Sequence, residues 1–164
     1  MDIQTALAAY PDISVPIVFA ATLEASLIVE REIKEHTPRG AFGTLKESIF
    51  TAGPEQTGND ILGVVSTALP YAEAVELGSK PHFPPLQPLI DWAQAKFGLQ
   101  EDEAKRTAWG VARTIARKGT EGKKMFELGA TAAAPTVTRI FDRALDEILK
   151  EIERRAGGQT EVKS

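Results

Sequence analysis

The chain has 164 residues, no cysteine and a formal net charge of −4, from 19 Lys and Arg against 23 Asp and Glu. A chain of this length buries about 70% of the surface that its unfolded form exposes, so it can build a core as one domain without disulfides. The absence of cysteine excludes disulfides, thiolate zinc sites, iron–sulfur clusters and a cysteine nucleophile. The mild acidity argues against a dedicated nucleic-acid binder, whose affinity would come mainly from a surplus of Lys and Arg.

The most apolar stretch, residues 15–29, is interrupted by Thr22, Glu24 and Ser26. It is shorter than the roughly 20 apolar residues that cross a bilayer. The first four residues lack the basic residues and apolar core of a signal peptide. We therefore expect no transmembrane helix and synthesis in the cytosol.

The first predicted helix runs from Ser14 to Lys34 and ends before Pro38. Ser14 can cap the free N–H groups of the first turn, and Pro16 fits that turn. Pro38 disfavours helical geometry at the residue before it. The helix is apolar over most of its circumference, which is typical of a helix that is buried or packs against a neighbouring subunit.

A β-hairpin is predicted after this helix, with strands at residues 45–51 and 61–67. The second strand is rich in β-branched residues, which favour strands. Residues 52–59 between the strands contain Gly, Pro and Asn and predict a long exposed turn. The run 71–76 fits either a third strand or a short helix, and we assign it to the sheet.

Helical spacing of apolar residues then predicts three more helices, at residues 86–97, 101–118 and 137–152. The Pro-rich segment before the first of these is predicted to be an irregular loop, because proline removes backbone N–H donors. Gly157 is expected to end the last helix. Residues 158–164 are polar, and we expect them to form a flexible tail.

Together these elements predict an α+β fold of one domain, residues 1–157. A small antiparallel β-sheet packs against the long N- and C-terminal helices, and two further helices lie between. The physical reason is that a short sheet needs a helical cover to be stable.

The sequence offers little for catalysis. His36 and His82 lack the spacing of metal-binding histidines, and no nucleophile elbow, phosphate-binding loop or dinucleotide fingerprint is present. We therefore predict no enzyme, with no catalytic, cofactor-binding or metal-binding residue. A small hydrolase that uses His82 with Glu76 is an alternative.

Two polar or irregular segments remain candidates for binding. Residues 81–85, Pro-His-Phe-Pro-Pro, form a stiff loop that either presents Phe83 to a partner or folds it over the protein's own core. A rigid loop loses little entropy when it docks. A basic run either contacts phosphate or compensates a helix dipole beside a solvated loop, and it comprises Arg113, Arg117, Lys118, Lys123 and Lys124.

Several short motifs, taken in order, resemble a known family. They are Pro38, Gly43, Leu45, Ser48 and Ile49, then Tyr71-Ala72, Val75-Glu76, Gly78-Ser79 and the run Pro81-His82-Phe83-Pro84-Pro85-Leu86. Their order and spacing over residues 14–97 resemble the tail-completion, or neck, proteins of long-tailed bacteriophages. Ala41-Phe42-Gly43 stands where that family usually has Asp-Thr-Gly, and Ser79 replaces the usual Thr.

The resemblance implies a non-enzymatic virion protein that completes the tail or joins it to the head. It implies a ring, most often of six copies, around the DNA channel, assembled in the host cytoplasm without a membrane. The implied partners are further copies, other neck and tail proteins (terminator, stopper and tail tube) and, in passing, double-stranded DNA. We expect an acidic or mixed lumen and weak DNA binding by the isolated protein at physiological salt. The alternative is a cytosolic adaptor domain that binds a protein partner through the Pro-rich loop.

A ring needs two different contact patches on each subunit. We expect these to be the Pro-rich loop at residues 81–85 and the hairpin tip at residues 53–59. The full predicted assembly interface comprises Pro38, Gly43, Leu45, Tyr71, Glu76, Gly78, Pro81, His82, Phe83, Pro84, Pro85, Lys123 and Lys124.

Overall fold

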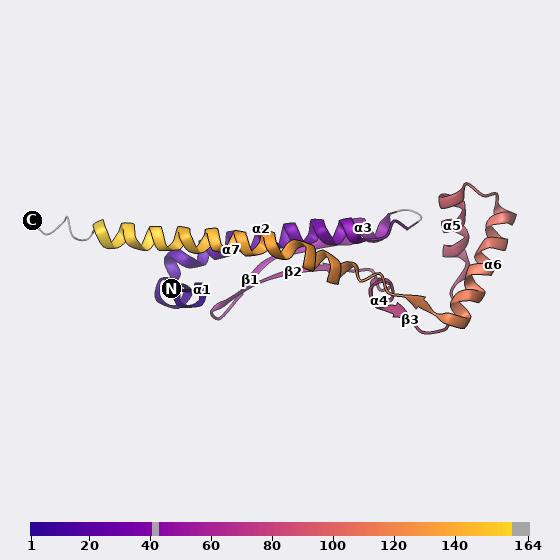
Figure 1. Cartoon of the computed structure of the whole chain (residues 1–164), viewed down its shortest axis with the longest axis horizontal. Helices are drawn as coiled ribbons and strands as arrows, with labels where there is room; N and C mark the ends of the chain where they lie inside the picture. The colour runs from indigo at the N-terminus through magenta and orange to yellow at the C-terminus, as the bar shows by residue number, and fades with distance from the viewer. Residues whose placement is uncertain (41–42, 159–164) are drawn as a thin grey trace, which may run out of the picture. The chain divides into compact units, whose positions relative to one another are not determined.

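The computed structural model describes residues 1–40 and 43–158. Within these residues the elements follow one another in the order α1 (Ile3–Ala9), α2 (Pro11–His36), α3 (Thr44–Ser48), β1 (Ile49–Thr57), β2 (Asp60–Thr67), α4 (Ala72–Leu77), β3 (Gly78–Ser79), α5 (Leu86–Phe97), α6 (Glu101–Lys118), β4 (Thr120–Glu121) and α7 (Met125–Gly158) (Figure 1). A small antiparallel sheet between long N- and C-terminal helices confirms the predicted α+β class. The predicted tail begins at Gly158, the last residue of α7, and its other residues lie outside the described part.

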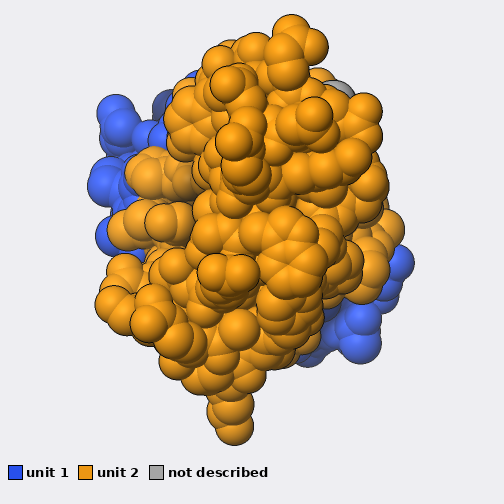
Figure 2. All heavy atoms as spheres, turned by 90° about the vertical axis from the view of Figure 1, so that its right-hand side faces the viewer, with its two compact units in different colours: residues 1–32, 51–66, 130–164 blue, residues 33–50, 67–129 orange. Residues whose placement is uncertain are grey.

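The chain forms two compact units and passes between them several times. Unit 1 comprises residues 1–32, 51–66 and the chain from residue 130, and unit 2 comprises residues 33–50 and 67–129 (Figure 2, blue and orange). Each unit has apolar clusters of its own. The single-domain boundary at residue 157 stays a prediction.

The core of unit 1 lies between α2 and α7. Ala21 and Ala25 of α2 pack with Ile140 and Ala144 of α7. A second cluster joins Ile13 and Val18, nearer the start of α2, to Ile148, farther along α7. The two helices therefore run in opposite directions, and alanine lets their backbones approach closely.

The start of unit 1 differs from the prediction. Residues 3–9 form α1, which the sequence analysis missed, and α2 begins at Pro11 rather than at Ser14. Proline is favoured at the first position of a helix because that residue's N–H would be unpaired in any case. Ser14 is buried inside α2, where its hydroxyl donates a hydrogen bond to the carbonyl oxygen of Ala6 (3.0 Å) or of Tyr10 (2.8 Å). Its role as N-cap was wrong, and it instead ties α1 to α2.

The β1–β2 hairpin is confirmed, but its limits were predicted wrongly. β1 starts at Ile49 and continues to Thr57, so the turn is Gly58-Asn59 instead of residues 52–59. Gly58 has a φ of +61°, which glycine adopts without steric cost. Pro54 is tolerated within β1 because both strands of a two-stranded sheet are edges.

The hairpin packs on α2 within unit 1. The Thr51 hydroxyl donates a hydrogen bond to the carbonyl oxygen of Ser26 (3.2 Å), and Ile61 contacts the apolar cluster of α2 and α7. Gly63 lies directly over Ser26, where a Cβ atom would overlap the serine side chain. The predicted packing of the sheet against both long helices is therefore present.

Two segments of unit 2 that were predicted as strand are helical. Residues 44–48 form α3, which starts after Gly43 at a φ of +69°, and Ser48 donates its hydroxyl hydrogen bond to the carbonyl oxygen of Leu45 (2.8 Å). Residues 72–77 form α4, so the run 71–76 is not part of the sheet. The short-helix alternative prevailed there because Ala and Glu favour helix and no neighbouring strand pairs with the run.

The helices α5 and α6 were predicted correctly and form a hairpin with its own small core. Ile90 and Ala93 of α5 pack against Ala104 and Ala108 of α6. Gly98 ends α5 in the left-handed conformation with a φ of +66°, and its N–H donates to the carbonyl oxygen of Gln94 (2.8 Å).

The helix α7 begins 12 residues earlier than predicted, at Met125 rather than Val137. The regular apolar spacing, which predicted this helix, begins only at residue 137. Pro135 lies inside the helix, and the segment before it is rich in alanine. The stronger cause of the early start is a capping side chain from another segment, described below.

The helix α2 is long and apolar enough to span a membrane by length and composition alone. Its 18-residue window has a mean hydropathy of 1.7, and 39% of that window is buried in the structure. Length and composition alone do not test the expectation of no transmembrane helix, which stays a prediction. Thr22 and Ser26 interrupt the apolar run only in the sequence, since their hydroxyls donate to carbonyl oxygens one turn earlier in the same helix (both 2.8 Å).

Candidate assembly surfaces

Two segments far apart in the sequence, residues 75–79 and 119–127, form a compact junction in unit 2 that we call the clasp. Gly78 pairs with Glu121 and Ser79 with Thr120 in an antiparallel ladder, and the Ser79 and Thr120 hydroxyls lie 2.9 Å apart. Beyond the ladder, the N–H of Lys123 donates to the carbonyl oxygen of Val75 (2.7 Å). The ladder and the Lys123–Val75 bond use backbone groups, so they depend on chain conformation more than on side-chain type.

Two glycines of the clasp adopt a backbone conformation that other residues avoid. Gly78 and Gly119 have φ values of +82° and +73°, with ψ near 180°, a combination that is essentially restricted to glycine. A Cβ atom on Gly78 would overlap the carbonyl oxygen of Thr120, and one on Gly119 would overlap that of Ser79. Gly78, predicted to lie in the assembly interface, is thus explained by the fold itself.

Glu76 lies in the clasp and caps α7. Its Oε2 accepts a hydrogen bond from the N–H of Phe126 (2.9 Å), and its Oε1 accepts one from the N–H of Glu127 (3.2 Å). A helix leaves its first N–H groups unpaired, and a carboxylate there also compensates the helix dipole. Glu76 therefore determines where α7 begins, and the sequence could not show this because the contact spans 50 residues.

The other predicted residues of unit 2 divide between core and surface. Leu45 is buried with Ala72 and Met125, so it contributes to the core rather than to a free surface. Pro38 and Tyr71 are exposed, and Gly43 is half-buried at the start of α3. Of these four positions, only Pro38 and Tyr71 offer a side chain to a partner.

The Pro-rich loop presents an aromatic pair. Phe83 lies against Trp109 of α6 with ring centroids 5.6 Å apart and an interplanar angle of 55°, yet the two residues remain 53% and 45% exposed. Phe83 is therefore neither a free protrusion nor part of a buried core. Pro81, His82 and Pro85 are exposed beside it, and Pro84 is half-buried.

Trp109 was missed by the sequence analysis. Ala104, Ala108 and Ala112 form the buried stripe of α6. A residue one position after Ala108 lies about 100° around the helix from that stripe. This offset was the available signal that the Trp109 side chain is not part of the helix–helix core.

Lys123 and Lys124 lie in the clasp, and their side chains are exposed. The Lys124 ammonium pairs with the Glu127 carboxylate (3.1 Å), and the Lys124 backbone has a φ of +53°. The remaining basic residues of the run, Arg113, Arg117 and Lys118, are exposed on α6. The structure therefore separates the basic run into a clasp part and a helical part.

Unit 1 exposes an apolar face that the predicted interface did not include. Phe19, Leu23 and Leu27 recur every four residues along α2 and are 38%, 39% and 52% exposed. On β2, the alternate residues Leu62 and Val64 also face outward. The signal was present in the sequence, since α2 is apolar nearly all round, but periodicity does not show which stripe lacks a cover.

The predicted hairpin tip is shorter and more polar than expected. Pro54 is buried, whereas Gly53 and residues 55–59 are exposed along the end of the hairpin. The Gln56 side chain donates to the carbonyl oxygen of Gly58 (3.2 Å), which closes the tip on itself. The tip offers polar groups, and the apolar part of the hairpin surface lies at Leu62 and Val64.

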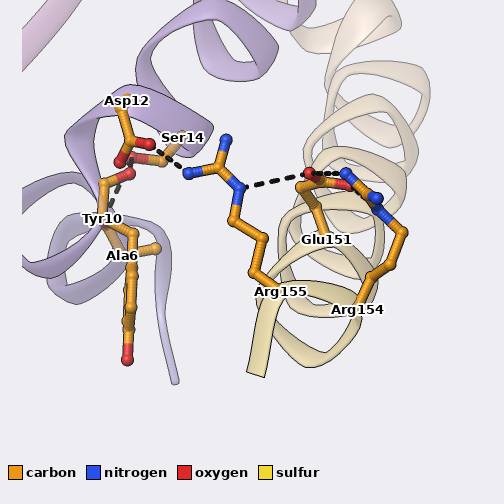
Figure 3. A network of polar contacts seen from close by, with 7 residues as sticks. All are labelled: Ala6, Tyr10, Asp12, Ser14, Glu151, Arg154 and Arg155. Atoms are coloured by element: carbon orange, nitrogen blue, oxygen red, sulfur yellow. Dashed lines mark hydrogen bonds and ion pairs between the residues drawn. The ribbon is translucent and has the colours of Figure 1, made fainter. Parts of the chain in front are cut away.

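A surface network of charges joins the two long helices in unit 1. Figure 3 shows Arg155 of α7 between Asp12 of α2 and Glu151 of α7, with Arg154 on the other side of Glu151. Arg154 donates to both oxygens of Glu151 (2.9 and 2.7 Å), and these bonds lower the pKa of Glu151 to about 2. The hydrogen bond from Arg155 lowers the pKa of Asp12.

The described residues contain no group of three or more His, Cys, Asp or Glu side chains that could hold a metal ion. The hydrolase alternative paired His82 with Glu76. The Glu76 carboxylate accepts from the α7 backbone, and the His82 Nδ1 lies 2.9 Å from the carbonyl oxygen of Lys80. Each group is thus engaged in local structure, and the structure does not bring the two together as a pair.

Comparisons with models of known protein families, with curated proteins and with solved structures found no match to this chain.

Proposed function

We propose that this protein is a structural component of a bacteriophage neck, which completes the tail or joins it to the head as a ring of subunits around the DNA channel. The order of motifs from Pro38 to Leu86 supports the family, as described above. The partners we propose are further copies of the chain, most often six to a ring, and adjacent neck and tail proteins. The protein is not an enzyme and acts in the virion.

The observation that carries this proposal is the exposed apolar face of α2. Phe19, Leu23 and Leu27 are 38–52% exposed on a helix whose other faces contact α7 and the hairpin. Exposed contiguous apolar side chains are typical of surfaces that other proteins cover. A ring requires a second, different patch, and the half-exposed Phe83–Trp109 pair in unit 2 provides one.

The test combines subunit mass with tail assembly. We expect native mass spectrometry of the purified protein to show a closed ring, or a monomer that joins tails in co-expression with its neighbouring genes. Leu23→Asp and Phe83→Ser should each abolish incorporation into tails. They place a charge or a hydroxyl in a patch from which assembly must exclude water. Thr138→Asp, on the exposed polar side of α7, is the matched control. If Leu23→Asp and Phe83→Ser both assemble like the wild type, the proposal is wrong.

A second candidate is the adaptor domain, and the exposed Phe83–Trp109 pair favours it specifically. An adaptor would use this one patch, whereas a ring subunit would need both. The two functions are therefore separated by the same variants. Loss of partner binding in Phe83→Ser, with full binding in Leu23→Asp and no ring at any concentration, would identify the adaptor.

A further inference from the structure

Charge is distributed unevenly along the chain. Residues 80–124 contain nine Lys and Arg against five Asp and Glu, a net charge of +4 in a chain whose total is −4. This segment comprises the Pro-rich loop, the α5–α6 hairpin and part of the clasp. Such an asymmetry indicates a local partner of opposite charge, even though the whole chain is acidic.

The positive charge is concentrated on α6. Residues 105–118 include five Lys and Arg and no Asp or Glu. Arg106, Arg113 and Arg117 are exposed and are separated by seven and four residues, which places them on one side of the helix. They are spaced by about 10 and 6 Å along the helix axis. We call these three residues the arginine face.

The arginine face is not neutralised by the part of the chain that the structure describes. In the described residues neither Arg113 nor Arg117 has a carboxylate partner, and Arg106 donates only to the carbonyl oxygen of Asp102 in its own helix (3.4 Å). The acidic residues of α6 lie in its first turn, where Glu101 pairs with Lys105 (2.6 Å). Compensation of the helix dipole explains Arg117 in the last turn, but it does not explain Arg106 or Arg113.

The Pro-rich loop lies against the same helix. Phe83 packs on Trp109, which precedes Arg113 by one helical turn. A further exposed cation, Lys80, precedes this loop, and three prolines between residues 81 and 85 stiffen it. The arginine face and the loop thus belong to one exposed surface with aromatic and basic side chains.

We propose that the arginine face binds the phosphate backbone of double-stranded DNA. The guanidinium group presents donors in a planar fork that matches phosphate oxygens, and it stays charged at every physiological pH. The inference rests on the proposed function only in choosing a DNA duplex as the polyanion. Three phosphate contacts bind weakly at physiological salt, whereas a ring would present the face several times to one duplex and gain by multivalency.

The test is fluorescence anisotropy of the full-length protein with a labelled 20-base-pair duplex of mixed sequence, in NaCl from 25 to 150 mM. Each neutralised phosphate contributes about −0.9 to the slope of log affinity against log salt, so three contacts predict a slope of about −2.7. Binding should therefore weaken by about 20-fold between 50 and 150 mM. Arg113→Gln with Arg117→Gln should reduce the slope to about −0.9 and weaken binding at 50 mM at least tenfold.

The matched control is Arg139→Gln with Lys150→Gln, which removes the same charge from exposed positions of α7 in unit 1. It should leave DNA affinity within twofold of the wild type. Circular dichroism of each variant checks that the helices remain. Equal losses in both double variants would show attraction by overall charge and overturn the proposal, as would a wild-type slope near zero.

A competition experiment and a mass measurement complete the test. Poly-L-glutamate at the same charge concentration should displace the duplex poorly, and efficient displacement would instead identify an acidic protein as the partner. Native mass is measured on the same samples. A ring that does not bind DNA contradicts this inference alone, whereas DNA binding by a protein that never enters tails contradicts the proposed function alone.

Discussion

The two units are stabilised in different ways. In unit 1, α2 and α7 pack through alanine and isoleucine side chains along several turns. In unit 2, the clasp joins segments more than 40 residues apart through backbone hydrogen bonds and one capping carboxylate. Apolar packing is distributed over many residues and can relax after a change, whereas a clasp fails when a single backbone position cannot adopt its conformation.

The surfaces differ in the same way. Unit 1 leaves apolar side chains of α2 and β2 uncovered, and unit 2 leaves arginine and aromatic side chains of α6 uncovered. The apolar side chains of unit 1 suit a contact with protein that excludes water. The arginines of unit 2 suit a salt-sensitive contact with a polyanion. These exposed side chains therefore differ in kind between the units: they are apolar in unit 1 and both aromatic and basic in unit 2.

Gly119→Ala should have the largest effect on stability. The substitution places a Cβ atom against the Ser79 carbonyl and imposes a backbone conformation that alanine avoids, at a cost of about 4 kcal/mol. Urea denaturation followed by circular dichroism measures this loss. Gly110→Ala is the control, because Gly110 lies inside α6 with open space around it and should gain about 0.5–1 kcal/mol. Similar effects at both glycines would contradict the role of the clasp.

Ile148→Ala should have the next largest effect on stability, and it tests the core of unit 1. Ile148 is fully buried among Ile13, Val18 and Ala6, so removing its side chain leaves a cavity and costs about 3 kcal/mol in the free energy of unfolding. Leu23→Ala, at an apolar but uncovered position of α2, should change that free energy by less than about 0.5 kcal/mol in the monomer. A large loss at Leu23 would mean that the monomer itself covers this face.

Glu76→Ala should have an intermediate effect, since it removes the cap of α7. Two N–H groups of the first turn lose their acceptor, and we expect a loss of about 1.5 kcal/mol. Hydrogen exchange should become faster at Phe126 and Glu127 before it changes in α6. Glu73→Ala, on the exposed side of α4, is the control and should be nearly neutral. Unchanged exchange at the start of α7 would contradict the capping role.

The charge network of unit 1 should have the smallest effect, and that effect depends on pH. The folded state lowers the pKa of Glu151 from 4.5 to about 2 and also lowers the pKa of Asp12. A lowered carboxyl pKa stabilises the fold above its unfolded value, and this contribution disappears as the pH falls from about 4.5 through 2. Arg154→Gln with Arg155→Gln should therefore flatten the acid side of the curve of melting temperature against pH. Because these groups lie at the surface, 0.5 M NaCl should flatten the wild-type curve in the same direction.

The sequence predicted best what depends on local patterns. The 3.6-residue spacing located α5, α6 and the C-terminal half of α7, and β-branched residues located β2. It failed where a distant segment decides the outcome. The start of α7 depends on Glu76, and Leu45 was assigned to an interface although Met125, 80 residues later, covers it.

The candidate surfaces were predicted in part for the same reason. Phe83 was identified from the stiffness of its loop, but its companion Trp109 comes from α6 and is placed by the alanine stripe beside it. The apolar circumference of α2 predicted a contact with another subunit or burial, and the structure shows which stripe, Phe19, Leu23 and Leu27, is left uncovered. The pattern of one helix or strand shows that it has an apolar face. Only the neighbouring elements decide whether that face is buried.

The paired ends of the clasp have a consequence for how this chain can change in length. Ser79 and Thr120 lie opposite one another in the ladder, so the chain leaves the clasp and returns to it at nearly the same point. Everything between them, residues 80–119, is therefore an insertion in the topological sense, and a short β-turn could reconnect the two ends. A shortened protein would keep the ladder and the cap on α7 while losing the arginine face and the Pro-rich loop. The deletion would remove the proposed DNA contact together with the Phe83–Trp109 patch and keep the apolar face of α2. The segment between Ser79 and Thr120 is where relatives of different length can diverge without refolding the rest.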